Sequence, residues 1–241
     1  MSLVARKVDW DKLNQEFEGQ TAQEFLGWAF KEFSSDMALA SSFGAEDVVL
    51  IDILWRLDPK FRVFSLDTGR LHEETYEVME AICEKYGITI ESYFPDAAKV
   101  ENLERERGFY SFRHSVEERK ECCGIRKVEP LNRALSGLKA WITGLRRDQG
   151  MTRTETDKIE IDNAYGSIVK LNPLADWSEK QVWDYIHENK VPYNKLHDRG
   201  FPSIGCSPCT RAIKFGEDIR AGRWWWETPD SKECGLHVKS A

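Results

Sequence analysis

The sequence lacks the features that would place the chain in a membrane or on a nucleic acid. Its first residues, MSLVARKVDWDKLNQEFEGQ, contain no apolar stretch of the signal-peptide type, and its longest apolar run, VVLIDILW, is interrupted by Asp52. Lys and Arg number 34 against 41 Asp and Glu, which leaves a net charge of −7 and no general basic surface for nucleic acid. We expect a cytoplasmic protein with no membrane span, no signal peptide and no nucleic-acid partner.

Internal repeats and low-complexity linkers are absent as well. The 241 residues suffice for one sizeable core, and 41% hydrophobic with 31% charged residues is an ordinary globular composition. From Val191 onward, prolines, glycines and loop-forming residues dominate. We therefore expect one main domain, residues 1–215, followed by a mobile carboxyl-terminal tail, residues 216–241.

Strand-like and helix-like segments alternate along the chain. Residues 1–34 carry apolar side chains at helical spacing, MALA and FRVFSL are strand-like, and HEETYEVMEAICEKYG is a helix closed by Gly87. The segments ITIESYF, LKAWIT and SIVKL are further strands, and SEKQVWDYIHEN begins with Ser178 and Gln181 at capping-box spacing. This order predicts an α/β fold, a mostly parallel sheet with helices on both faces.

Four cysteines form two close pairs, Cys122 with Cys123 and Cys206 with Cys209. A disulfide between neighbours closes a strained ring and restrains little chain entropy, so the adjacent pair indicates another use for its thiols. Two pairs supply the four soft ligands that zinc or an iron–sulfur cluster requires. Because neighbouring side chains diverge, the pattern favours the larger cluster, with zinc and free thiols as alternatives.

The other two cysteines differ in their surroundings. Cys83 lies on the apolar face of its helix and is expected to fill the core. Cys234, in SKECGLHVKSA, has Lys232 and His237 nearby, which would favour its thiolate, although an unremarkable tail cysteine is the alternative.

Three loops follow strands of the predicted parallel sheet: SSFGAED, LDTGR and TGLRRDQGMTR. Such loops converge at the carboxyl edge of the sheet, where these folds bind ligands. In the first loop, Ser41 and Ser42 offer hydroxyls, Gly44 permits close approach of the backbone, and the helix that follows presents unpaired N–H groups to an anion. The loops together predict a nucleotide site, although Gly-containing turns of this kind are common.

Basic residues recur in the same regions of this acidic chain. Each one alone is an ordinary solvated charge, but together they indicate a pocket for phosphate or sulfate. The residues are Lys127, Arg146, Arg147, Arg153, Arg220 and Arg223.

Six motifs in this order, SSFGAED, LDTGR, ECCGIRKVEPL, GCSPCTRAI, GRWWWE and KECGLH, resemble the assimilatory adenylyl-sulfate (APS) reductases of the phosphoadenylyl-sulfate (PAPS) reductase family. The resemblance extends from about Ala38 to Val238. SFGAED also resembles a variant of the PP-loop of ATP pyrophosphatases. The resemblance implies a Rossmann-like fold of the adenine nucleotide alpha hydrolase type.

Carried to matching positions, the resemblance implies that Cys122, Cys123, Cys206 and Cys209 hold one 4Fe-4S cluster per subunit and that Cys234 is the catalytic nucleophile. The implied substrate-binding residues are Ser41, Ser42, Gly44, Leu66, Asp67, Gly69, Lys127, Gly144, Arg146, Arg147, Arg153, Arg220, Arg223 and His237.

The resemblance also implies a reaction. This is the reduction of adenosine 5'-phosphosulfate to sulfite and AMP through an S-sulfocysteine on Cys234, with thioredoxin or glutaredoxin as reductant, on the route of sulfate assimilation toward cysteine. A homo-oligomer is expected. The alternatives are the same reaction on PAPS or on both nucleotides, a PP-loop sulfur-transfer enzyme acting on tRNA, and a zinc-binding adaptor without catalysis.

Overall fold

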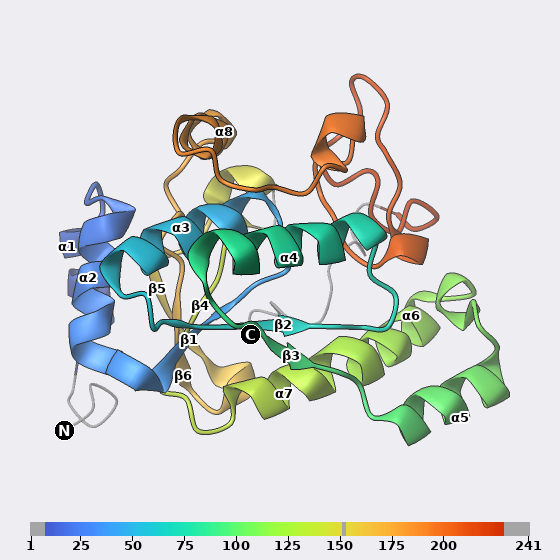
Figure 1. The fold of residues 1–241 in the computed structure, drawn as a ribbon. Helices are drawn as coiled ribbons and strands as arrows, with labels where there is room; N and C mark the ends of the chain where they lie inside the picture. The colour runs from blue at the N-terminus through green and yellow to red at the C-terminus, as the bar shows by residue number, and fades with distance from the viewer. Residues whose placement is uncertain (1–7, 151–152, 229–241) are drawn as a thin grey trace. The chain divides into compact units, whose positions relative to one another are not determined.

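The structure is a computed structural model that describes residues 8–150 and 153–228 (Figure 1). The chain divides into two compact units, whereas the sequence suggested one main domain. No linker-like composition marks the division, because the chain passes between the units several times. The predicted boundary between residues 215 and 216 stays a prediction. Unit 1 comprises Met1–Phe64, Glu77–Glu91 and Gly137–Asn194, and unit 2 comprises Ser65–Tyr76, Ser92–Ser136 and Lys195–Ala241.

A six-stranded sheet is the central element of the fold, with the strand order β3-β2-β1-β4-β6-β5 (Figure 1). The pairs β1–β2, β1–β4 and β4–β6 are parallel, and only the edge pair β5–β6, among those with a described register, is antiparallel. The prediction of a mostly parallel sheet is confirmed. The strands are β1 (Met37–Ala40), β2 (Arg62–Leu66), β3 (Glu91–Tyr93), β4 (Ala140–Ile142), β5 (Ile159–Asp162) and β6 (Ile168–Leu171).

The central strands are short and mostly apolar, and they are buried on both faces. All residues of β4 and β6 are buried, and Leu39 of β1 pairs in register with Val63 and Ile142. Such continuous burial is expected where helices cover a parallel sheet. The same core includes Phe25, Leu26 and other apolar residues of the amino-terminal helices, as their spacing predicted.

Two helix ends carry the capping signals that the sequence predicted. The hydroxyl of Ser178 accepts a hydrogen bond from the backbone N–H of Gln181, and the backbone N–H of Ser178 donates to the side chain of Gln181. The predicted capping box of α8 is therefore confirmed. Gly87, with φ +64°, follows the end of α4 and donates its N–H to the carbonyl of Cys83. The helices are α1 (Trp10–Phe17), α2 (Ala22–Phe33), α3 (Ala45–Leu57), α4 (Glu73–Tyr86), α5 (Ala97–Arg107), α6 (Val116–Cys123), α7 (Glu129–Leu135) and α8 (Glu179–Glu188).

The strand order creates a switch point inside unit 1. Strand β1 lies between β2 and β4, so the chain leaves β1 toward one side of the sheet while β4 lies on the other. In open α/β sheets, ligands bind at the carboxyl ends of the strands at such a point. The loops there are residues 41–44 and 143–149, which the sequence had linked to a nucleotide.

In the part of the chain that the structure describes, no helix is long and apolar enough to cross a bilayer.

Candidate active site

The loop after β1 is held by the carboxylate of Asp47, a residue of the first turn of α3. One oxygen of Asp47 accepts hydrogen bonds from the backbone N–H of Ser42 at 2.6 Å and from its hydroxyl at 2.9 Å. Burial raises the pKa of Asp47 to about 6, although the hydrogen bonds from Ser42 oppose the shift. The strained position of the loop is Phe43, with φ +58°, whereas Gly44 has an ordinary φ of −72°. Asp47 is a residue that the sequence analysis did not include in the site.

The loop after β4 approaches the start of α3 closely at Gly144. A methyl group at Gly144 would lie 2.5 Å from Oδ1 of Asp47 and 2.9 Å from Cβ of Glu46. Only glycine fits there without displacement of α3. Two of the three loops predicted to bind a nucleotide, those after β1 and β4, are therefore adjacent within unit 1.

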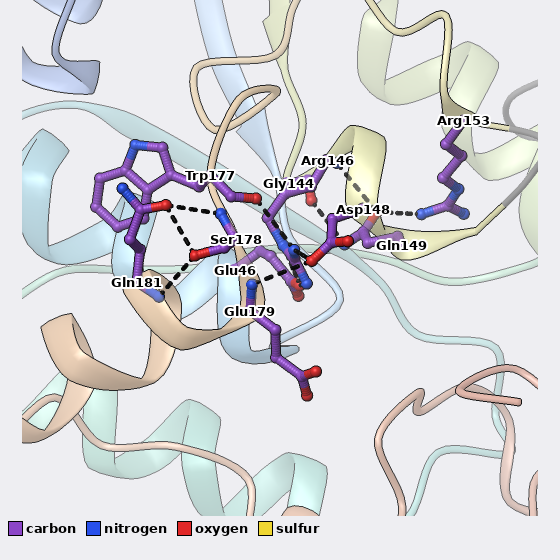
Figure 2. A network of polar contacts seen from close by, with 10 residues as sticks. All are labelled: Glu46, Gly144, Arg146, Asp148, Gln149, Arg153, Trp177, Ser178, Glu179 and Gln181. Carbon is purple, nitrogen blue, oxygen red and sulfur yellow. Dashed lines mark hydrogen bonds and ion pairs between the residues drawn. The ribbon is translucent and has the colours of Figure 1, made fainter. Parts of the chain in front are cut away.

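Arg146 is buried and makes its contacts with protein groups (Figure 2). Its Nε donates to Glu46 at 2.9 Å, and its Nη1 donates to the carbonyl of Trp177 at 3.1 Å. Gln149, in the same loop, accepts from the backbone N–H of Arg146 and donates to the carbonyl of Gly144. These contacts fix the loop that follows β4, and the assignment of Arg146 to the substrate stays a prediction.

The other two arginines of this loop also have protein partners. Arg147 forms a bidentate ion pair with Glu18 at 2.6 and 3.0 Å and donates from Nε to the carbonyl of Thr156. Arg153 donates to the side chain of Gln149 (Figure 2). Their assignment to the substrate likewise stays a prediction.

Within unit 2, all four paired cysteines line one cavity. Cys122 is buried, and Cys123, Cys206 and Cys209 are half-buried. Among the described residues, no three His, Cys, Asp or Glu side chains are arranged to hold a single metal ion. At this cavity, the fold brings together two cysteine pairs that lie far apart in the sequence.

The adjacent cysteines both reach the cavity at the end of α6, where the helix changes its winding. Residues Gly124–Val128 form a π-helical turn between α6 and α7, and Glu129 donates its N–H to the carbonyl of Gly124. Pro130, in the first turn of α7, has no N–H to continue an α-helical ladder, and the wider turn accommodates it. The sequence ECCGIRKVEPL thus specifies a helix that is interrupted just after its two cysteines.

The cysteine cavity is an unfavourable place for several thiolates at once. Burial and, to a smaller extent, the neighbouring Cys206, Cys123 and Cys122 together raise the pKa of Cys209 to about 12, against an opposing effect of Lys127. Burial also raises the pKa of Cys122, while the guanidinium groups of Arg126 and Arg70 act in the opposite direction. Thiols become thiolates in such a site when positive charge is supplied.

Cations supply much of the lining. Among the described side chains around the cavity, five are cationic and none is acidic, and the rings of Phe112 and Trp224 complete the wall. Lys127 and Arg223 were predicted from the sequence as site residues. Arg70, Arg119 and Arg126 were not.

The LDTGR loop contacts the cysteines through groups that the sequence analysis did not name. The hydroxyl of Thr68 lies 3.3 Å from Sγ of Cys206, and the carbonyl of Arg70 accepts from the N–H of Ser207 at 2.8 Å. Arg126 donates to the carbonyl of Thr68 at 2.7 Å and to Glu104 at 2.6 Å.

The three predicted residues of that loop have local roles that are compatible with several functions. Asp67 accepts a hydrogen bond from the hydroxyl of Tyr76 and from the N–H of Gly69, and burial together with Asp67 raises the pKa of Tyr76 to about 12. Leu66 ends β2 and is half-buried. Their contact with substrate stays a prediction.

Arg223 is a buried cation directly beside the second cysteine pair. Its Nη1 donates to the hydroxyl of Ser203 and to the carbonyl of Ile204, both at 3.2 Å. A methyl group at Gly205 would collide with the Arg223 guanidinium, 2.6 Å from Cζ. Glycine at 205 therefore makes room for this cation next to Cys206.

The remaining predicted site residues cannot be placed in the cavity. Arg220 is half-buried, contributes backbone hydrogen bonds to Asp218 and Arg223, and is not among the described lining residues. Cys234 and His237 lie outside the residues that the structure describes.

The fold and the site together define an α/β protein with the type of sheet that binds nucleotides and with a cation-rich cavity lined by four cysteine thiols. Comparisons with known proteins identify the group more closely. The family model for the phosphoadenosine phosphosulfate reductase domain matches residues 36–212. Because this match covers most of the chain, the protein belongs to that family.

Individual relatives carry a more specific name. The chain is 51% identical to an adenosine 5'-phosphosulfate reductase of Allochromatium vinosum, over 90% of this chain and 84% of that protein. It is 46% identical to 5'-adenylylsulfate reductase 3 of Arabidopsis thaliana, over 97% of this chain and 52% of the plant protein.

A solved structure supports the fold assignment. The structure of a PAPS reductase from Candida auris, a phosphate complex, resembles this one with a TM-score of 0.75 and 28% identity, over 88% of this chain and 100% of that chain. The prediction of membership in this family, made from the motifs, is confirmed.

Proposed function

We propose that the protein is an adenylyl-sulfate reductase, which converts adenosine 5'-phosphosulfate and a dithiol to AMP, sulfite and a disulfide. The observation that carries the proposal is the cavity in unit 2, where four cysteines meet five cationic side chains. The relatives in bacteria and plants that bear this name support the choice of substrate.

The nucleotide is proposed to bind at the switch point in unit 1. Ser41, Ser42 and Gly44 lie in the loop before α3, and the first N–H groups of that helix have no side-chain cap. Such groups, together with the helix dipole, favour an anion. The conformation of this loop depends on Asp47 and on the close approach of Gly144.

The four cysteines of the cavity are proposed to hold a 4Fe-4S cluster. Their donor set is four thiols, the set that such clusters use, and they reach the cavity as two separate pairs. When bound, the cluster supplies positive iron charge to the thiolates and ties the end of α6 to the Cys206–Cys209 loop. Arg126 and Lys127 extend from the turn that follows Cys123 and offset the negative charge of the thiolates.

The chemistry is proposed to begin at Cys234. Its thiolate attacks the sulfur of the sulfate group, the bond from that sulfur to the phosphate oxygen breaks, and AMP leaves with the electron pair. The enzyme then carries Cys–S–SO3⁻. Cationic side chains are needed at this step, because a thiolate and a sulfonate repel each other.

The second step needs an external dithiol, for which thioredoxin or glutaredoxin is proposed. One of its thiolates attacks Sγ of Cys234, and sulfite leaves with the electron pair of the broken S–S bond. The second thiol of the reductant then releases Cys234. The sulfur of the sulfate group gains two electrons, which the dithiol loses on forming its disulfide. A homo-oligomeric state is part of the proposal and is independent of this chemistry.

The intact mass of anaerobically purified protein, incubated with APS and no reductant, tests the proposal. One SO3 group, about 80 Da by elementary composition, is expected on the wild-type chain and not on a Cys234→Ser variant. The family name and the Candida auris structure make PAPS the second candidate substrate. An adduct with PAPS alone would move the assignment to that nucleotide, and no adduct with either would contradict the proposed mechanism.

A further inference from the structure

A buried ion pair joins α6 to the end of the described chain. Nε of Arg119 lies 2.6 Å from Oε1 of Glu227, and their side chains are only 0% and 4% exposed. Arg119 also lines the cysteine cavity, three residues before Cys122. This pair lies entirely within unit 2.

Trp224 connects the same ion pair to the cysteines. The guanidinium groups of Arg119 and Arg223 lie 4.6 and 4.7 Å from the centre of its ring system. The backbone N–H of Trp224 donates to the carbonyl of Cys209 at 3.1 Å, and the backbone carbonyl of Trp224 accepts from the N–H of Glu227 at 2.8 Å. Residues 224–227 are thus fixed both to the helix and to the loop that carry the paired cysteines.

The energetic cost of burying this ion pair indicates that the pair has a role other than stability. Two charges that are removed from water lose their hydration, and a well-packed apolar pair is often equally stable or more stable. An ion pair differs from an apolar pair in that it permits only one orientation of the two groups. Arg119 and Glu227 therefore fix the direction of the chain at Glu227, which an apolar pair would not do.

We propose that Arg119 is a positioning residue for the reaction of Cys234: through Glu227 and Trp224, it fixes the point from which the chain continues to the nucleophile. The proposal rests on the proposed function, in which Cys234 receives the sulfonate. Seven residues lead from Glu227 to Cys234, and an extended chain of that length spans at most about 25 Å. A tethered group reacts according to its effective concentration, which depends on where its tether begins.

A Glu227→Gln variant tests the proposal in single-turnover experiments with APS and no reductant. We expect the SO3 adduct to form at least tenfold more slowly, while the dissociation constant for AMP and the visible absorption remain as in the wild type. Glu217→Gln is the matched control. Glu217 forms a bidentate pair with Arg211 at 2.8 and 2.9 Å in the same unit, but about a third of each side chain is exposed. The rate of adduct formation in the Glu217→Gln variant should therefore stay within twofold of the wild type.

An Arg119→Met, Glu227→Met double variant separates position from stability. We expect its melting temperature to return toward the wild-type value while adduct formation stays slow. Recovery of both would overturn the inference, because packing alone would then suffice. An adduct that forms as fast in Glu227→Gln as in the wild type would also overturn it. If the wild-type chain forms no adduct, the proposed function fails and the inference fails with it.

Discussion

The arginines of the two units have different surroundings. In unit 1, Arg146 and Arg147 point to Glu46, Glu18 and backbone carbonyls, so their charge stabilises the fold of the loop that carries them. In unit 2, cations surround a cavity whose described lining contains no carboxylate. Clustered arginines in a sequence therefore do not by themselves define an anion site. In unit 2, Arg119 and Arg126 also have carboxylate partners, Glu227 and Glu104, so this unit differs in that its cations line a cavity together with four cysteines.

The largest effect is expected from loss of one cavity cysteine. Cys209→Ser should abolish turnover and remove the absorption near about 400 nm that an iron–sulfur cluster gives, because one of four ligands is missing. Cys83→Ser is the control. Cys83 lies in α4, in the other unit, and should leave both properties unchanged. Equal loss of absorption in both variants would contradict the special role of the cavity.

The arginines of unit 1 should matter first for stability. Arg146→Met removes one partner of a buried pair with Glu46 and should lower the free energy of unfolding by about 3–5 kcal/mol in urea denaturation. Arg147→Met breaks a pair that is partly exposed and should cost about 1 kcal/mol or less. The AMP affinity of the two variants tests their assignment to the substrate. A stability loss that is equal in both would contradict the contrast in burial.

A small change in unit 2 should impair catalysis without a comparable loss of stability. Gly205→Ala places a methyl group against the Arg223 guanidinium and should displace this cation, which lowers turnover by about tenfold to a hundredfold. Gly27→Ala in α2 is the control, because nothing lies within 4 Å of the added methyl group. Steady-state kinetics compares the two. Turnover of Gly205→Ala at the wild-type rate would show that the position of Arg223 is unimportant.

A further effect concerns the loop after β1 and depends on pH. Burial raises the pKa of Asp47 from 3.8 to about 6, so the folded chain keeps a proton that the unfolded chain has lost between about pH 4 and pH 6. The stability contribution of Asp47 therefore falls as the pH rises through this window.

An Asp47→Asn variant lacks that dependence. Its free energy of unfolding relative to the wild type should increase by roughly 2 kcal/mol between pH 4.5 and pH 7. Urea denaturation at the two pH values measures the difference. A constant difference would contradict the raised pKa of Asp47.

The sequence predicted the sheet because its central strands are apolar runs separated by helical periodicity. It did not reveal β5, a four-residue edge strand in which Glu160 and Asp162 alternate with isoleucines and burial is only partial. It also gave no element between Pro95 and Gly137, where α5 and α6 are polar and contain few buried residues.

The candidate site was predicted where residue chemistry is unusual and missed where it depends on contacts. Paired cysteines and serine–glycine loops are visible in a sequence, and the fold gathers the four cysteines at one cavity. The partners of Arg119 and Arg126 come from segments distant in the chain, so no local pattern indicated that these arginines would be buried.

The proposed function depends most directly on what the four cysteines bind. Iron, acid-labile sulfide and zinc should be determined together on anaerobically purified full-length protein, with a Mössbauer spectrum of the same sample after iron-57 labelling. The proposed function predicts four iron and four sulfide ions per chain with the spectrum of one cubane cluster. A single zinc ion per chain, without iron or sulfide, would contradict it.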